Sequence, residues 1–142
     1  MQGDPHAGLA ELDSASCWQL LAAAEIGRIA VAIAGDVEIF PISFAIDHET
    51  IVFRTAEGTK FAAALIGPRV AFEADGYDPI ASEAWSVVVK GSAREVSMAE
   101  ELPEAAFGTL HPWHQARKDR VVRIVPASIA GRRFTVAAHP AR

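Results

Sequence analysis

The feature that most constrains the fold is a set of short segments in which apolar residues occupy alternate positions. In VEIFPISFAID, Phe40, Ile42, Phe44 and Ile46 recur with a period of two, which is the spacing of a β-strand with one buried face. The preceding segment, GRIAVAIAGD, ends in a Gly-Asp turn, and such a turn favours a hairpin between the two strands. The pattern therefore predicts a β-sheet protein.

Four more segments have strand character: TIVFRTA (50–56), RVAFEAD (69–75), AWSVVVKGSAREVS (84–97) and RVVRIVPASIAGRRF (120–134). The last is expected to break at a turn before a short extended finish. Helices are expected from Cys17 to Ile26, with Ser16 and Gln19 as a capping box and Gly27 as the stop, from about Thr59, and over 98–110. Six strands in antiparallel-looking succession, with only short helices between them, favour a closed or partly closed β-barrel.

The length and charge narrow the class of protein. A chain of 142 residues suits one domain, expected over 11–136 between flexible tails at 1–10 and 137–142. A net charge of −5 argues against a nucleic-acid binder. The sequence has no apolar stretch of membrane-spanning length and only one cysteine, Cys17. We therefore expect a cytoplasmic protein, and no metal site, because His111 and His114 lack further ligands nearby.

The stretch FRTAEGTK has the residue types expected of an anion site. A glycine followed by Thr59 and Lys60 marks a helix start, where unpaired backbone N–H groups attract anions. Arg54 and Thr55 leave the preceding strand and can reach the same place with a guanidinium fork and a hydroxyl. The alternative is that Thr59 only caps the helix while both cations face solvent or a surface carboxylate. No Walker A loop or G-x-G-x-x-G motif is present, so ATP and dinucleotide folds fit poorly.

The order of these segments resembles that of the flavin-binding split-barrel family related to pyridoxamine 5′-phosphate oxidase, especially its short actinobacterial-type members. The resemblance covers roughly Leu12 to Phe134 and is densest at FRTAEGTK. It implies a mainly β fold, a six-stranded antiparallel split barrel. It also implies a homodimer with FMN in each of two grooves at the subunit interface.

The resemblance also implies which residues contact the cofactor. Four residues at the strand end and helix start would hold the flavin phosphate: Arg54, Thr55, Thr59 and Lys60. Three residues of the second strand would place their backbone along the edge of the isoalloxazine ring: Pro41, Ile42 and Ser43. Pro41 is otherwise an edge-strand proline, because it cannot donate to a ladder. Trp85 and Trp113 lie in segments that approach the flavin from the partner subunit, the alternative being ordinary packing.

The expected function is that of an FMN-binding oxidoreductase acting on a small molecule. The sequence identifies no catalytic residue, substrate or electron donor. Pyridoxamine 5′-phosphate oxidase activity itself is not expected, because GRRFTVAAHPAR retains only a fragment of the basic and aromatic segment that grips the substrate in such enzymes. One alternative cofactor is the deazaflavin F420, whose acidic tail would suit Arg117, Lys118 or Arg120. Another alternative is a non-catalytic protein that binds a flavin or a different ligand such as haem.

Overall fold

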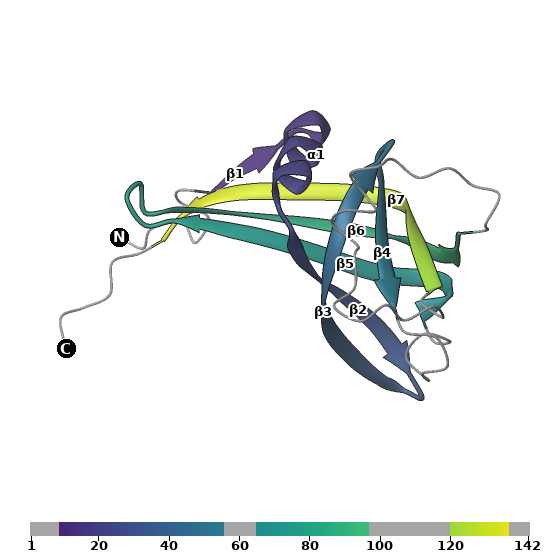
Figure 1. Cartoon of the computed structure of the whole chain (residues 1–142). Helices are drawn as coiled ribbons and strands as arrows, with labels where there is room; N and C mark the ends of the chain where they lie inside the picture. The colour runs from purple at the N-terminus through teal and green to yellow at the C-terminus, as the bar shows by residue number, and fades with distance from the viewer. Residues whose placement is uncertain (1–8, 56–64, 97–119, 137–142) are drawn as a thin grey trace.

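The structure, a computed structural model, describes residues 9–55, 65–96 and 120–136 (Figure 1). The described residues form one helix and seven strands: β1 (Leu9–Leu12), α1 (Ser14–Ala23), β2 (Ile26–Ile33), β3 (Asp36–Asp47), β4 (Thr50–Thr55), β5 (Gly67–Asp78), β6 (Glu83–Glu95) and β7 (Arg120–Thr135). The helices expected from Thr59 and over 98–110 lie outside these residues.

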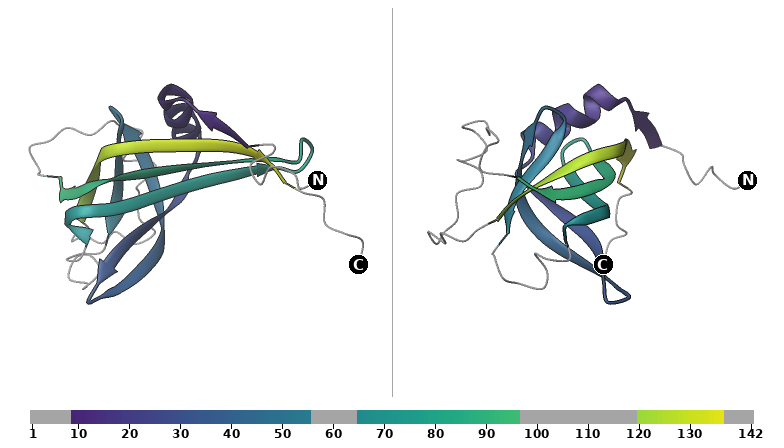
Figure 2. Two further views of the ribbon diagram at one scale, coloured as in Figure 1. Left: turned by 180° about the vertical axis from the view of Figure 1, so that it is seen from behind. Right: turned by 90° about the vertical axis from the view of Figure 1, so that its right-hand side faces the viewer.

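Six of the strands close into an antiparallel barrel, as predicted. The hydrogen-bonded order is β1-β7-β4-β3-β2-β5-β6, and β6 pairs in turn with β7. One edge of β7 is shared by two strands, since β4 pairs with its first half and β1 with its second. The β5–β6 hairpin and the second half of β7 extend beyond the barrel, with β1 alongside (Figures 1 and 2). The split-barrel fold is therefore confirmed, with β1 as an added short strand.

The barrel interior is filled by alternate residues of every strand. Phe44, Phe53 and Phe72 are almost completely buried, and the rings of Phe44 and Phe72 meet edge to face with centroids 4.8 Å apart. The helix α1 buries Cys17, Trp18 and Leu21 in the same core and packs against β7, β3 and β6. Ile42 and Phe44 of β3 also face this core, so the alternating odd-numbered residues of β3 before Ala45 face outward.

Three boundaries differ from those expected. The helix begins at Ser14, because the Asp13 carboxylate caps it by accepting the Ser16 N–H at 2.8 Å. Gly27 does not end the helix but lies in β2, where a Cβ would be 2.5 Å from the Phe72 ring. At the other end, Leu9 and Ala10 were expected in the N-terminal tail but belong to β1.

The last strand also differs from the prediction, since β7 runs without a turn from Arg120 to Thr135. Lys90 pairs with Ser128 and Gly91 with Pro126, so Ala127 is an extra residue in the ladder. A bulge of this kind absorbs the proline, which cannot donate a hydrogen bond, and lets the strand continue.

Candidate functional site

The best candidate for an anion ligand is Arg54, at the end of β4. It follows Ile51, Val52 and Phe53, all fully buried, and is itself half-buried. Its Nε atom is buried and has no hydrogen-bond partner. A buried donor without an acceptor costs about 1–3 kcal/mol, a cost that an anion at this atom would offset. Arg54 therefore fits the predicted phosphate site.

The other predicted phosphate ligands are only partly described. Thr55 is half-buried and pairs with Arg120 of β7, whose Nε lies 3.5 Å from a Glu95 carboxylate oxygen. Thr59 and Lys60 lie outside the described residues. The structure thus places two of the four predicted residues, Arg54 and Thr55, together at the end of one strand.

The predicted ring-edge segment lies on β3 beside that strand end. Pro41 pairs with Arg28 of β2, whereas the ladder with β4 includes only residues 44–47 of β3. Within the described residues, β3 therefore has an open edge at Pro41, as expected for a proline. Pro41 and Ser43 are exposed on the outer face, and Ile42 is buried in the core.

Ser43 and Arg54 share this outer face. Phe44 pairs with Phe53 at the end of the β3–β4 ladder, so the next positions along the two strands are Ser43 and Arg54. Both point away from the core because they alternate with the inward phenylalanines. Pro41, at the edge of β3, and Arg54, with its unpartnered Nε, consequently lie on the same outer face of the described residues.

Trp85 lies elsewhere in the chain, on the part of the β5–β6 hairpin that extends beyond the barrel. It is half-buried and faces a hollow of about 430 Å³. Residues of β5, β6 and the end of β7 line this hollow, among them Glu73, Asp75, Tyr77 and Phe134. No residue of β3 or β4 lines it, so Arg54 is not part of this hollow. Trp113 lies outside the described residues.

A charged cluster that the sequence did not predict crosses from β2 to β5. Arg28 Nη1 donates to a Glu73 carboxylate oxygen at 3.0 Å and to an Asp75 oxygen at 3.2 Å. Burial and the neighbouring Asp75 carboxylate raise the pKa of Glu73 to about 7, against the opposing effect of Arg28. Arg28 pairs with Pro41 in the β2–β3 ladder, so the Glu73 carboxyl lies on the same outer face as the ring-edge segment. This carboxyl gains or loses a proton near neutral pH.

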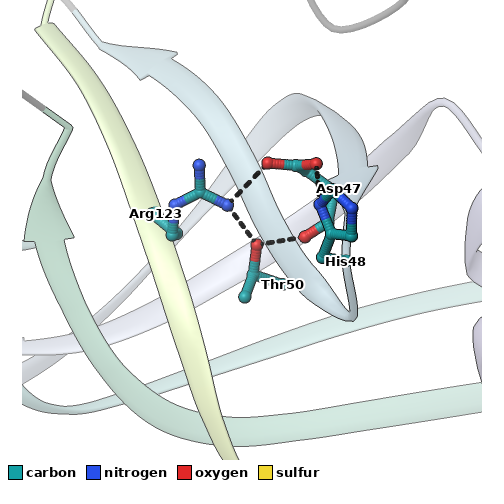
Figure 3. Close-up of polar contacts among 4 residues, drawn as sticks. All are labelled: Asp47, His48, Thr50 and Arg123. Carbon is teal, nitrogen blue, oxygen red and sulfur yellow. Dashed lines mark hydrogen bonds and ion pairs between the residues drawn. The ribbon is translucent and has the colours of Figure 1, made fainter. Parts of the chain in front are cut away.

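A second unpredicted cluster is buried at the opposite end of the β3–β4 hairpin (Figure 3). Arg123 Nη1 of β7 donates to Asp47 Oδ2 at 2.9 Å and to Thr50 Oγ1 at 2.6 Å. Asp47 and Arg123 are both more than nine-tenths buried. We call these three residues, Asp47, Thr50 and Arg123, the Arg123 network. His48 Nδ1 lies 2.7 Å from the other Asp47 oxygen on the solvent side.

The described residues lack two features, a metal cluster and a membrane-spanning helix. No three His, Cys, Asp or Glu side chains in this part of the chain are grouped as a metal ion requires. None of its helices has the length and apolar character needed to span a membrane.

Comparison with known proteins establishes the family. Residues 13–133 match the sequence profile of the family described as Pyridoxamine 5′-phosphate oxidase. The chain belongs to this family. A relative of uncharacterized function in Mycobacterium tuberculosis H37Rv is 38% identical over 97 residues, which are 68% of this chain and 86% of the relative. A second from the same strain is 35% identical over 129 residues, 87% of this chain and 84% of the relative.

Solved structures of similar proteins have the same fold. The FAD-binding protein of Mycobacterium smegmatis is 37% identical and superimposes with a TM-score of 0.70, covering 89% of this chain and 98% of its own. A FAD-binding protein of Mesorhizobium loti has a TM-score of 0.72 at 22% identity, covering 89% and 99% of the two chains. The second likeness concerns the fold alone.

Proposed function

We propose that this protein binds a flavin nucleotide, FMN in the first place, and acts with it as an oxidoreductase on a small molecule. The observation that carries the proposal is the buried Nε of Arg54, which has no partner and lies at the strand end where a phosphate is expected. The family and the similar FAD-binding protein of Mycobacterium smegmatis support a flavin. FMN and FAD share the phosphate on the ribityl chain, so Arg54 suits either.

The isoalloxazine ring is placed by this proposal along the open edge of β3. Backbone groups of Pro41, Ile42 and Ser43 border that edge, and Ser43 joins it to Arg54 on one face. A bound flavin supplies hydride and electron transfer. The chain's own part is to hold the phosphate, orient the ring and exclude water, and we assign no residue as a catalytic acid or base.

We further propose a homodimer with the cofactor at the subunit interface. Val37 and Ile39 of β3 are 73% and 64% exposed and Ile26 of β2 is 55% exposed, and apolar side chains gathered on one surface are typical of an interface. Trp85 lines a hollow that no residue of β3 or β4 lines, so in this proposal its indole reaches the ring from a second copy. The buried, unpaired Cys17 suits a reducing compartment, which supports the cytoplasm as the location.

The cofactor is tested by identifying and titrating it. Any chromophore released from the purified protein is identified by mass, and the dissociation constants of FMN, FAD, F420 and riboflavin are measured by fluorescence. Because a hydrogen bond to a charged group contributes about 1.5–3 kcal/mol, we expect Arg54→Met to weaken FMN binding about tenfold or more. Riboflavin, which lacks the phosphate, should bind equally well to both proteins.

Arg69→Met is the matched control for the loss of a cation, since Arg69 is an exposed arginine of β5, a strand that does not pair with β4. It should leave the binding of both ligands unchanged. Failure to bind any flavin, or an equal response of FMN and riboflavin to Arg54→Met, would overturn the proposal. If F420 binds in place of FMN, the proposed cofactor changes to F420 and the proposed phosphate site stands. A bound flavin that no nicotinamide or other donor reduces would overturn the oxidoreductase part.

A further inference from the structure

The Arg123 network connects three strands at one end of the β3–β4 hairpin. Arg123 is 7% exposed near the start of β7, opposite Val52 of β4. From there it reaches Asp47, the last residue of β3, and Thr50, the first residue of β4. Thr50 Oγ1 also donates to the Asp47 carbonyl at 2.5 Å. The network therefore ties both ends of the turn to β7 (Figure 3).

The turn itself does little to favour the hairpin. Its residues His48 and Glu49 both have left-handed backbone angles, with φ of 50° and 56°. Two-residue turns of this kind prefer Asn-Gly, and a left-handed conformation costs other residues roughly 1–2 kcal/mol each. Such strain persists only where the surroundings hold it in place. The Arg123 network supplies contacts of that kind.

The opposite end of the same hairpin carries Arg54. The ladder runs from the Asp47–Thr50 pair to the Phe44–Phe53 pair, and Arg54 follows directly. The turn sets the register of a hairpin, and a slip of one residue would move every side chain to the other face. The turn and its contacts to β7 therefore help to place Arg54 on the outer face, together with the burial of Ile51 and Phe53.

The network also separates the roles of two arginines on one face. Arg54 pairs with Val121 and Arg123 with Val52, so the two guanidinium side chains leave neighbouring positions of the β4–β7 ladder on the same side. Asp47 neutralises Arg123 and draws it toward the turn. Arg123 is thereby held at the turn by Asp47 and Thr50, and Arg54, at the other end of the hairpin, has a buried Nε without a partner.

We propose that Asp47, Thr50 and Arg123 are positioning residues that hold the β3–β4 hairpin against β7 so that Arg54 presents its guanidinium to the phosphate of the cofactor. This inference rests on the proposed function, because it requires that Arg54 bind that phosphate. The network touches neither the phosphate nor the ring. Its effect should be confined to the contribution that the phosphate makes to binding.

The test uses the ratio of the riboflavin to the FMN dissociation constant, which isolates that contribution. The double change Asp47→Asn with Arg123→Gln removes the ion pair of the network without altering net charge. We expect the ratio to fall about tenfold, the worth of about one charged hydrogen bond, while riboflavin affinity stays within about twofold. Thr50→Val, which keeps the branched shape, should lower the ratio about threefold. Neither change should lower it further in the Arg54→Met protein, since interactions of one unit are not additive.

His48→Asn is the matched control, because it removes an exposed contact to the same carboxylate and asparagine tolerates the left-handed angle. It should leave the ratio unchanged. Melting curves verify that each variant is folded, and if the double variant is not, Thr50→Val decides. A folded variant with an unchanged ratio, or an equal loss of FMN and riboflavin, overturns the positioning role. If Arg54→Met itself leaves the ratio unchanged, the proposed function has failed instead.

Discussion

Replacing Glu73 by glutamine is expected to stabilise the protein at alkaline pH and to have little effect at pH 5. The carboxyl is held by Arg28 at 3.0 Å but crowded by Asp75, and its pKa is raised from 4.5 to about 7. A folded state with the higher pKa binds a proton more tightly than the unfolded chain does. The free energy of unfolding therefore falls as pH rises from about 4.5 to about 7, and glutamine removes that fall.

The magnitude follows from the size of the shift. A rise of about 2.5 pH units, at about 1.4 kcal/mol per unit, sets an upper limit of about 3.5 kcal/mol. The Glu73 side chain is 33% exposed, and solvent screening reduces the effect to about 1 kcal/mol. Arg28 keeps its second carboxylate, Asp75, in the variant. We thus expect the melting temperature of Glu73→Gln to exceed that of the natural protein by about 3 °C at pH 8.5.

The assay is thermal unfolding of both proteins at a series of pH values from 5 to 8.5, at constant ionic strength. Glu83→Gln is the matched control, because Glu83 also pairs with an arginine, Arg133, at 3.1 Å but has no carboxylate neighbour in that contact. Its difference from the natural protein should not grow with pH. A Glu73→Gln difference that stays constant across the series, or that shrinks as pH rises, would refute the reasoning.

Three further changes test the fold. Gly27→Ala should lower the free energy of unfolding by about 1–3 kcal/mol in denaturant melts, because the alanine Cβ would lie 2.5 Å from the Phe72 ring and 2.9 Å from the Glu73 carbonyl. An unchanged denaturation midpoint would mean that β2 and β5 are less closely packed than this. Glu49→Gly should raise stability by up to about 1 kcal/mol by relieving its positive φ, and a loss would contradict the turn geometry. Asp13→Ala should cost about 1 kcal/mol through loss of the helix cap, whereas Asp13→Ser should restore most of it.

Much of the barrel was predictable because each strand carries its own periodic pattern. The alternation at Phe40, Ile42 and Phe44 is a local property, and the structure places Phe44 and Ile42 in the core as that alternation requires. The helix start was misplaced because Asp13 and Ser16 are both good caps, and only packing decides between them. The β7 turn was wrongly expected because a proline in sequence does not reveal a bulge opposite Gly91.

The candidate site was predictable where its residues are neighbours in sequence, and not where strand pairing brings them together. Arg54 and Thr55 stand out in the sequence beside the helix start predicted at Thr59. The alternation in FEAD places Glu73 and Asp75 on one face of a strand, but nothing local says that Arg28 lies opposite. Asp47 and Arg123 are 76 positions apart, so their ion pair depends on a β4–β7 register that the sequence pattern does not specify.

The pairing of β7 with three other strands affects how the protein folds while it is being synthesised. Residues 120–135 are synthesised after the other six strands, yet they pair with β1, β4 and β6. Until they leave the ribosome, β4 and β6 each lack a neighbour on one side, and Val122 and Ile124 are missing from the core. Open strand edges associate with other chains, and contacts between distant segments form slowly. The interval between the emergence of β6 and that of β7 is thus the stage at which aggregation competes with folding.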